Sequence, residues 1–164
     1  MKKLIISSLF IFFAASTVLK ADTNIAKYDG GSEKISSSVL QQFGYTFYRA
    51  SDVNWTINSS YQKATFILNG KTTYAIYNLS NKFLVATQLA NVSDLPTQAQ
   101  ETLKKDYADY DTANILKVIS RPADYEMEDD TNAFWLDLSK GNEHVIAIVF
   151  PKSDLRVVKI ESIN

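Results

Sequence analysis

Apolar residues recur with two different periods along the chain, and the period changes in a regular order. Ile35, Val39, Phe43 and Phe47 are spaced by four residues, which predicts an amphipathic helix over about 36–48. Alternation of apolar and polar residues follows and indicates strands with one buried face. The four strands predicted in this part of the chain cover residues 53–57, 64–68, 73–79 and 83–89.

The same order of periods returns in the second half of the chain. Ala99, Leu103 and Tyr107 follow Asp94-Leu95-Pro96 at helical spacing and predict a helix over about 96–110. Alternating segments then predict four further strands, over residues 114–120, 133–138, 144–150 and 155–160. Because short connections join consecutive strands, the strands must pair antiparallel.

Turn residues separate these strands. Asn69-Gly70 is typical of a two-residue hairpin, because both central positions of such a turn need a positive φ. Ser80-Asn81 is suited to a similar turn, since Asn tolerates the left-handed region.

The order of elements predicts an α+β fold of two tandem helix-plus-four-strand antiparallel repeats. The first α/β repeat would cover residues 35–92 and the second residues 93–164, with apolar positions such as Leu40 and Leu103 equivalent in the two. Any two modules of this kind would share such positions by pattern alone, so the order of elements carries most of the argument. We expect both helices on one face of the sheet, which leaves the other face open.

The first residues have the pattern of an export signal. Lys2 and Lys3 precede the apolar stretch Leu4–Ala15, and small or polar residues follow. We expect residues 1–21 to be a signal peptide that is removed, and the polar residues 22–34 to be a flexible lead-in. The apolar stretch is shorter than the roughly 20 residues that span a membrane. The mature protein is therefore expected to be periplasmic or secreted, with no membrane association.

Composition narrows the classes of partner and of chemistry. The chain has 17 basic and 18 acidic residues, and cleavage would remove Lys2, Lys3 and Lys20, so the mature protein would be acidic. An acidic chain without a basic cluster disfavours a nucleic-acid partner. The sequence has no Cys and a single His, His144, and no glycine-rich phosphate loop. These residues predict no enzyme, no cofactor and no metal centre.

One acidic segment offers candidate ligands for Ca²⁺, because this ion prefers oxygen ligands. Its carboxylates are those of Asp124, Glu126, Glu128, Asp129 and Asp130. The spacing and the central Gly of a calcium-binding loop are missing. A solvated loop explains the charges more simply, and the sequence alone leaves Ca²⁺ binding open.

Short motifs across the mature chain match those of a known family. They are Phe47, Ala50, Val53 and Trp55, the run Tyr61-x-x-Ala64-x-Phe66-x-x-x-Gly70, and Leu95-Pro96 followed by Lys105-x-Tyr107. With these residues the chain resembles secreted proteins, frequent in Bacteroidetes, that are β-lactamase-inhibitor-like with PepSY-like tandem repeats. It departs from that pattern at Tyr48, where Pro is common, and at Asn81 and Asp154, where Gly is frequent. The resemblance implies helices packed on one side of a concave, protein-binding sheet, and it brings no catalytic residues.

Alternation also points to residues for binding on the open face. If Phe134 and Leu136 face the helices, Trp135 lies on the other side among polar residues. The same reasoning puts Tyr77 on the open face of the first half, together with Thr65 and Ile67. A register shifted by one residue would instead bury Trp135 and expose Phe134, and both registers stay open. The other Trp, Trp55, is expected in the core between Val53 and Ile57.

The sequence therefore predicts an exported, non-enzymatic binding module that takes a protein or peptide, in the manner of an inhibitor, on an open sheet face. The candidate partner-binding residues are Trp135, Tyr77, Thr65 and Ile67. The alternative is a cystatin-like or NTF2-like domain with a pocket for a small ligand, which requires a strongly curved sheet around one long helix. The identity of the partner and the oligomeric state are left open by the sequence.

Overall fold

A computed structural model describes residues 35–125 and 129–162 of the protein. The predicted signal peptide over 1–21 and the lead-in over 22–34 lie outside these residues. The elements in chain order are α2 (Ser37–Thr46), β1 (Ser51–Ile57), β2 (Tyr61–Leu68), β3 (Lys71–Asn78), β4 (Phe83–Leu89), the 3₁₀ turn η2 (Val92–Asp94), α3 (Thr97–Asp106), β5 (Asp111–Ser120), β6 (Phe134–Lys140), β7 (Glu143–Val149) and β8 (Leu155–Ser162). The predicted helices and strands are thus present, with ends shifted by a few residues.

The predicted fold class of two tandem repeats is wrong. All the described strands form one eight-stranded antiparallel sheet in the order β1-β2-β3-β4-β5-β6-β7-β8, accompanied by two short helices of ten residues each. β4 pairs with β5 through Gln88 opposite Lys117 and Leu89 opposite Leu116, so one hydrogen-bonded ladder crosses the middle of the chain. Sequence periodicity reports the faces of each strand separately. It therefore could not show that the fourth and fifth strands are neighbours.

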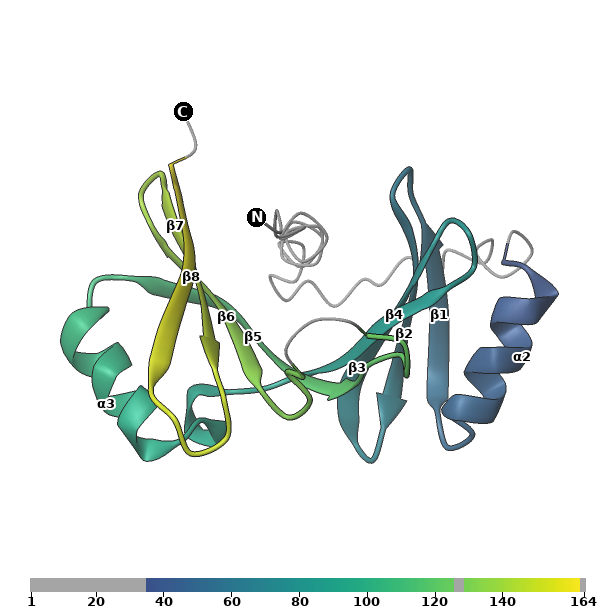
Figure 1. Ribbon diagram of the computed structural model, residues 1–164, viewed down its shortest axis with the longest axis horizontal. Helices are drawn as coiled ribbons and strands as arrows, with labels where there is room; N and C mark the ends of the chain where they lie inside the picture. Colours follow the sequence, from purple (N-terminus) through teal and green to yellow (C-terminus); the bar gives the residue numbers. More distant parts are fainter. Residues whose placement is uncertain (1–34, 126–128, 163–164) are drawn as a thin grey trace.

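The sheet is curved, and α2 and α3 lie on its outer side at opposite ends (Figure 1). We call the side that carries the helices the helix face and the inner side the concave face. Side chains that lie opposite each other on paired strands share a face of the sheet. The helix face therefore follows from the registers of the eight strands together with the residues that contact each helix.

The first core lies between α2 and strands β1 to β4. α2 begins after Ser36, whose hydroxyl accepts a hydrogen bond of 3.3 Å from the backbone N–H of Val39. Its apolar stripe brings Phe43 against Trp55 and Phe66, with ring centroids 5.2 and 5.0 Å apart. Trp55 is 6% exposed, so its predicted place in the core is confirmed.

The second core lies between α3 and strands β5 to β8. Ala99 and Leu103 of α3 are buried against a set of side chains from the sheet. That set is Ile115, Phe134, Leu136, Leu138, Val145, Ala147 and Val149. The two cores are separate clusters on the same face of one sheet.

The connections between strands follow their turn residues. Asn69 and Gly70 have φ of 53° and 75°, so the predicted hairpin turn is confirmed. Asn81 adopts φ of 65°. Asn thus supplies the left-handed conformation that this hairpin requires.

Candidate functional site

Trp135 lies on the concave face, in the register that the first of the two sequence interpretations gives. Its neighbours Phe134 and Leu136 are buried in the α3 core, and Trp135 itself is half-buried on the other side of β6. In the sheet it stands between Leu116 of β5 and Ile148 of β7. The alternative register, with Phe134 exposed, is therefore wrong.

Thr65 and Ile67 also lie on the concave face, on β2. Both are half-buried, and they alternate with Phe66, which is buried under α2. Thr65 stands opposite Tyr74 of β3, so Tyr74 shares their face. Three strands separate β2 from β6, so the structure places these residues and Trp135 on one face without bringing them into contact.

Tyr77 is the exception among the predicted binding residues, since it lies on the helix face. Its side chain is fully buried in the α2 core, with its ring centroid 5.8 Å from that of Trp55. The predicted exposure of Tyr77 is therefore wrong. Tyr74, Ala75, Ile76 and Tyr77 are all apolar or aromatic, so this part of β3 shows no alternation from which its faces could be assigned.

The hydroxyl of Tyr77 gives a first testable prediction, because it has no hydrogen-bond partner among residues 35–125 and 129–162. Burial raises the pKa of Tyr77 to about 12. The folded state therefore favours the neutral phenol, and stability that is present below pH ~10 is lost as the pH rises toward 12. Tyr77→Phe should raise the free energy of unfolding by about 1 kcal/mol at pH 7.

Urea melts of the wild type and of Tyr77→Phe at pH 7, 9 and 11 would test this prediction. The difference in the free energy of unfolding between the variant and the wild type should grow by about 1 kcal/mol per pH unit above pH 10. The other tyrosines are common to both proteins, so their titration cancels in this difference. A Tyr77→Phe protein that is less stable than the wild type at every pH would show that the hydroxyl is hydrogen-bonded.

The centre of the concave face is apolar. One cluster of buried residues lies over strands β2 to β5 and consists of Tyr61, Ile76, Val85 and Val118. A second lies over β5 and β7 and consists of Leu116 and Ile146. Trp135 packs against both clusters. The indole therefore occupies the place where the two halves of the concave face meet.

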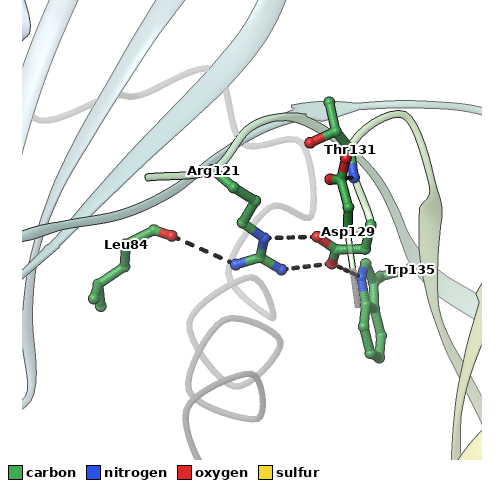
Figure 2. A network of polar contacts seen from close by, with 6 residues as sticks. Leu84, Arg121, Asp129, Thr131 and Trp135 are labelled. Carbon is green, nitrogen blue, oxygen red and sulfur yellow. Dashed lines mark hydrogen bonds and ion pairs between the residues drawn. The ribbon is translucent and has the colours of Figure 1, made fainter. Parts of the chain in front are cut away.

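A buried ion pair holds the edge of this indole (Figure 2). Arg121 donates from Nε to Oδ1 of Asp130 at 2.7 Å and from a terminal nitrogen to Oδ2 at 2.6 Å. Trp135 donates from Nε1 to the same Oδ2 at 2.8 Å. The side chains of Arg121 and Asp130 are only 8% and 3% exposed. This geometry is bidentate, which is the strongest arrangement for such a pair.

The same Arg connects the segment after β5 to the first half of the sheet. A guanidinium nitrogen of Arg121 lies 3.5 Å from the backbone carbonyl oxygen of Leu84 in β4. Figure 2 draws this contact as a dashed line. The guanidinium carbon lies 4.5 Å from the ring centroid of Tyr125. Burial raises the pKa of Tyr125, and the Arg121 charge opposes that rise. Arg121 thus links β4, the β5–β6 connection and, through Asp130, the indole of Trp135.

The sequence pattern did not reveal this network. Asp130 belongs to an acidic segment that is typical of a solvated loop, but it is buried against Arg121. Asp129 does lie at the surface, and hydrogen bonds from Thr131 hold its pKa below the usual range. The one available signal was the indole of Trp135, which needs a hydrogen-bond acceptor when it is buried.

The acidic segment gives no metal centre within the residues that the structure describes. Asp124 lies 3.8 Å from Lys82, and no group of three potential metal ligands occurs in the described ranges. Glu126 and Glu128 lie outside those ranges.

His144 also lies on the concave face, at the start of β7. Its Nδ1 is 3.2 Å from Oδ1 of Asp137, a carboxylate that is almost fully buried. Ser139 stands opposite His144 in the sheet, but no hydrogen bond joins the two within the described part of the chain. The three residues therefore lack the Ser-to-His contact that a catalytic triad requires.

The structure contains a small pocket of about 100 Å³ between residues of the middle strands of the sheet. Its lining residues include Lys71, Gln88, Asp94, Lys117 and Phe134. Sites for small organic ligands are usually about 300–1,000 Å³.

Among the described helices, none is long and apolar enough to cross a membrane.

Comparison with solved structures identifies the fold. A BLIP-like protein from Bacteroides fragilis superposes with a TM-score of 0.59 at 12% identity, covering 78% of this chain and 86% of that one. A DUF2874 family protein from Bacteroides ovatus gives 0.58 at 16% identity, with 77% and 86% covered. A proposed periplasmic protein from Bacteroides eggerthii gives 0.58 at 14% identity, with 77% and 88% covered.

No protein-family model matches the sequence, and no curated protein matches it either. The structural neighbours confirm the resemblance to β-lactamase-inhibitor-like proteins of Bacteroidetes at the level of the fold. They give no indication of PepSY-like repeats.

Proposed function

We propose that the protein is an exported, non-enzymatic binding module that takes a protein or peptide on its concave face. The observation that carries this proposal is the position of Trp135, half-buried between two apolar clusters and held at its N–H by Asp130. Fixed aromatic side chains at the centre of a face are typical anchors of protein interfaces, because they give a large contact area at little cost in conformational entropy. The BLIP-like fold supports the same function by analogy.

The first half of the concave face supplies the rest of the proposed site. Thr65, Ile67 and Tyr74 are half-buried there, so part of each side chain can contact a partner. The ammonium of Lys63 lies 5.6 Å from the ring centroid of Tyr74, and burial lowers the pKa of Lys63. A partner that offers both apolar groups and a carboxylate would complement this surface.

The alternative of a small-ligand pocket loses its structural basis. It requires one long helix inside a curved sheet, but the two described helices have ten residues each and lie at opposite ends of the sheet (Figure 1).

The proposed location is the periplasm or the exterior of the cell. The basic and apolar pattern of residues 1–21 supports export. The proposed periplasmic protein from Bacteroides eggerthii supports the same location through its fold.

The second prediction tests the proposed binding face. The protein would be immobilised and used to capture partners from the envelope fraction of its source organism, in parallel with Trp135→Ala, Ile67→Ala and Tyr45→Ala. Trp135→Ala should weaken capture of the partner by about 30-fold, which corresponds to about 2 kcal/mol. Ile67→Ala should weaken it less, in the same direction.

Two controls separate binding from folding. Tyr45 on α2 is 89% exposed and lies away from the concave face, so Tyr45→Ala should leave capture unchanged. Trp135 also donates a hydrogen bond to Asp130, so its substitution can lower stability as well as binding. A denaturant melt of each variant must therefore accompany the capture experiment. If only Tyr45→Ala reduces capture, the partner binds the helix face and the proposed site is wrong.

A further inference from the structure

The two edge strands of the sheet, β1 and β8, differ in length and in backbone conformation. β1 is interrupted near its start, where the register with β2 shifts between Ser51 and Asn54 and Asp52 has φ of 53°. A residue with positive φ at the start of an edge strand bends that edge away from a further partner. β8 also contains one bulge, at Val158, and pairs with β7 on both sides of it. β8 is one residue longer than β1, and none of its residues has a positive φ.

The side chains of β8 are unusual for a strand edge facing water. On the helix face, Val157 and Ile160 are 41% and 61% exposed. On the concave face, the strand carries Arg156, Lys159 and Glu161, opposite Ile148, Ile146 and His144 of β7. Exposed β-branched residues on a long edge favour addition of another strand.

We propose that β8 pairs antiparallel with β8 of a second copy of this chain, about an axis between Val158 and Lys159. In this register Val157 lies opposite Ile160 of the second copy, and both side chains are on the helix face. Arg156 lies opposite Glu161 of the second copy, and both are on the concave face. Because the axis is twofold, each favourable pair occurs twice.

Neighbouring registers do not have this complementarity. A slip of one residue places Val157 opposite Lys159, which pairs side chains that point to opposite faces. A slip of two residues between the two β8 strands can keep paired side chains on the same face of the sheet. It places Arg156 of one copy opposite Lys159 of the other, so two positive charges meet. The bulge at Val158 thus selects one register out of the possible ones.

In the proposed dimer, Glu161 would accept hydrogen bonds both from Lys159 of its own strand and from Arg156 of the second copy. The guanidinium of Arg156 lies 5.0 Å from the ring centroid of Phe150, and Lys159 pairs with Glu161 along the strand. These contacts orient the charged groups on the concave face. A single pair of eight-residue strands would bury less than the roughly 1,200 Å² of a stable interface, so the dimer is weak and depends on concentration.

Cysteine cross-linking tests the register, since the chain has no Cys of its own. Val157→Cys and Ile160→Cys would be oxidised separately and as an equimolar mixture. The mixture should give a disulfide-linked dimer, because positions 157 and 160 face each other. Each variant alone should not, because identical positions lie three residues apart along the strands, about 10 Å, beyond the reach of a disulfide of about 7 Å. Equal cross-linking in all three samples, or none in the mixture, would overturn the register.

Sedimentation equilibrium provides a test that does not depend on oxidation. The wild type should change from monomer to dimer with rising concentration, and Ile160→Asp should remain monomeric over the same range. Val53 on β1 is 41% exposed, so Val53→Asp is a matched control that should dimerise like the wild type. A wild type that is monomeric at about 1 mM, or an Ile160→Asp protein that still dimerises, would refute pairing through β8. Neither outcome affects the concave face, so failure here leaves the proposed function standing.

Discussion

Trp55→Ala is expected to lower the free energy of unfolding by about 3–5 kcal/mol, because it removes a large side chain from a packed core. The indole is 6% exposed and contacts the rings of Phe43 and Tyr77, with centroid distances of 5.2 and 5.8 Å. The α2 core has few atoms that could fill the space, since its sheet side is built largely of Ala64, Ala75 and Ala86 between these rings. Chemical denaturation monitored by circular dichroism would measure the loss.

Val53→Ala on the same strand is the matched control. Val53 is 41% exposed, so its truncation should cost well under 1 kcal/mol. If Trp55→Ala and Val53→Ala are equally mild, Trp55 does not lie in the core. The prediction would then fail together with the register of β1.

Arg121→Met should lower the free energy of unfolding by as much as Trp55→Ala, but for an electrostatic reason. It leaves the carboxylate of Asp130 buried without its cation, and breaking a buried pair in this way typically costs about 3–5 kcal/mol. Trp135 would remain the donor to that carboxylate at 2.8 Å, but one neutral N–H does not replace a guanidinium. The loss should appear as a lower denaturation midpoint with an unchanged slope.

The double variant Arg121→Met with Asp130→Asn separates the charge from the packing. Asn keeps an oxygen that can accept from the indole and removes the uncompensated charge, so the double variant should be more stable than Arg121→Met alone. Additive losses from the two substitutions would show that the ion pair contributes little through its charge.

The hydrophobic pattern predicted the elements well where only one face of each was apolar. The four-residue spacing of Val39 and Phe43 marks α2, and alternation around Trp135 separates the two faces of β6, although it left open which of them is buried. On β3 the pattern failed, because its buried residues lie on both faces and Tyr77 could not be distinguished from Tyr74. The pattern also did not show that β4 pairs with β5, since this pairing depends on contacts between residues distant in the chain.

The candidate site was only partly predictable for a related reason. Trp135 lies on a regular strand, where alternation limits the direction of its side chain to two registers, and the structure selects one of them. Arg121 and Asp130 lie in the connection between β5 and β6, where no period applies, and their partnership depends on how that connection folds back over β4. The cluster of acidic residues between Asp124 and Asp130 gave no indication that the side chain of Asp130 is buried.

The pairing of β4 with β5 has a consequence for the order in which the protein can acquire its structure. Synthesis from the N-terminus delivers β1 to β4 before β5, so the edge of β4 has no neighbour until about thirty more residues have followed. During that interval the edge is open to other nascent chains. The Arg121 contact to Leu84 then joins the late segment to the early one, so completion of the middle of the sheet is the step that ends this vulnerable interval.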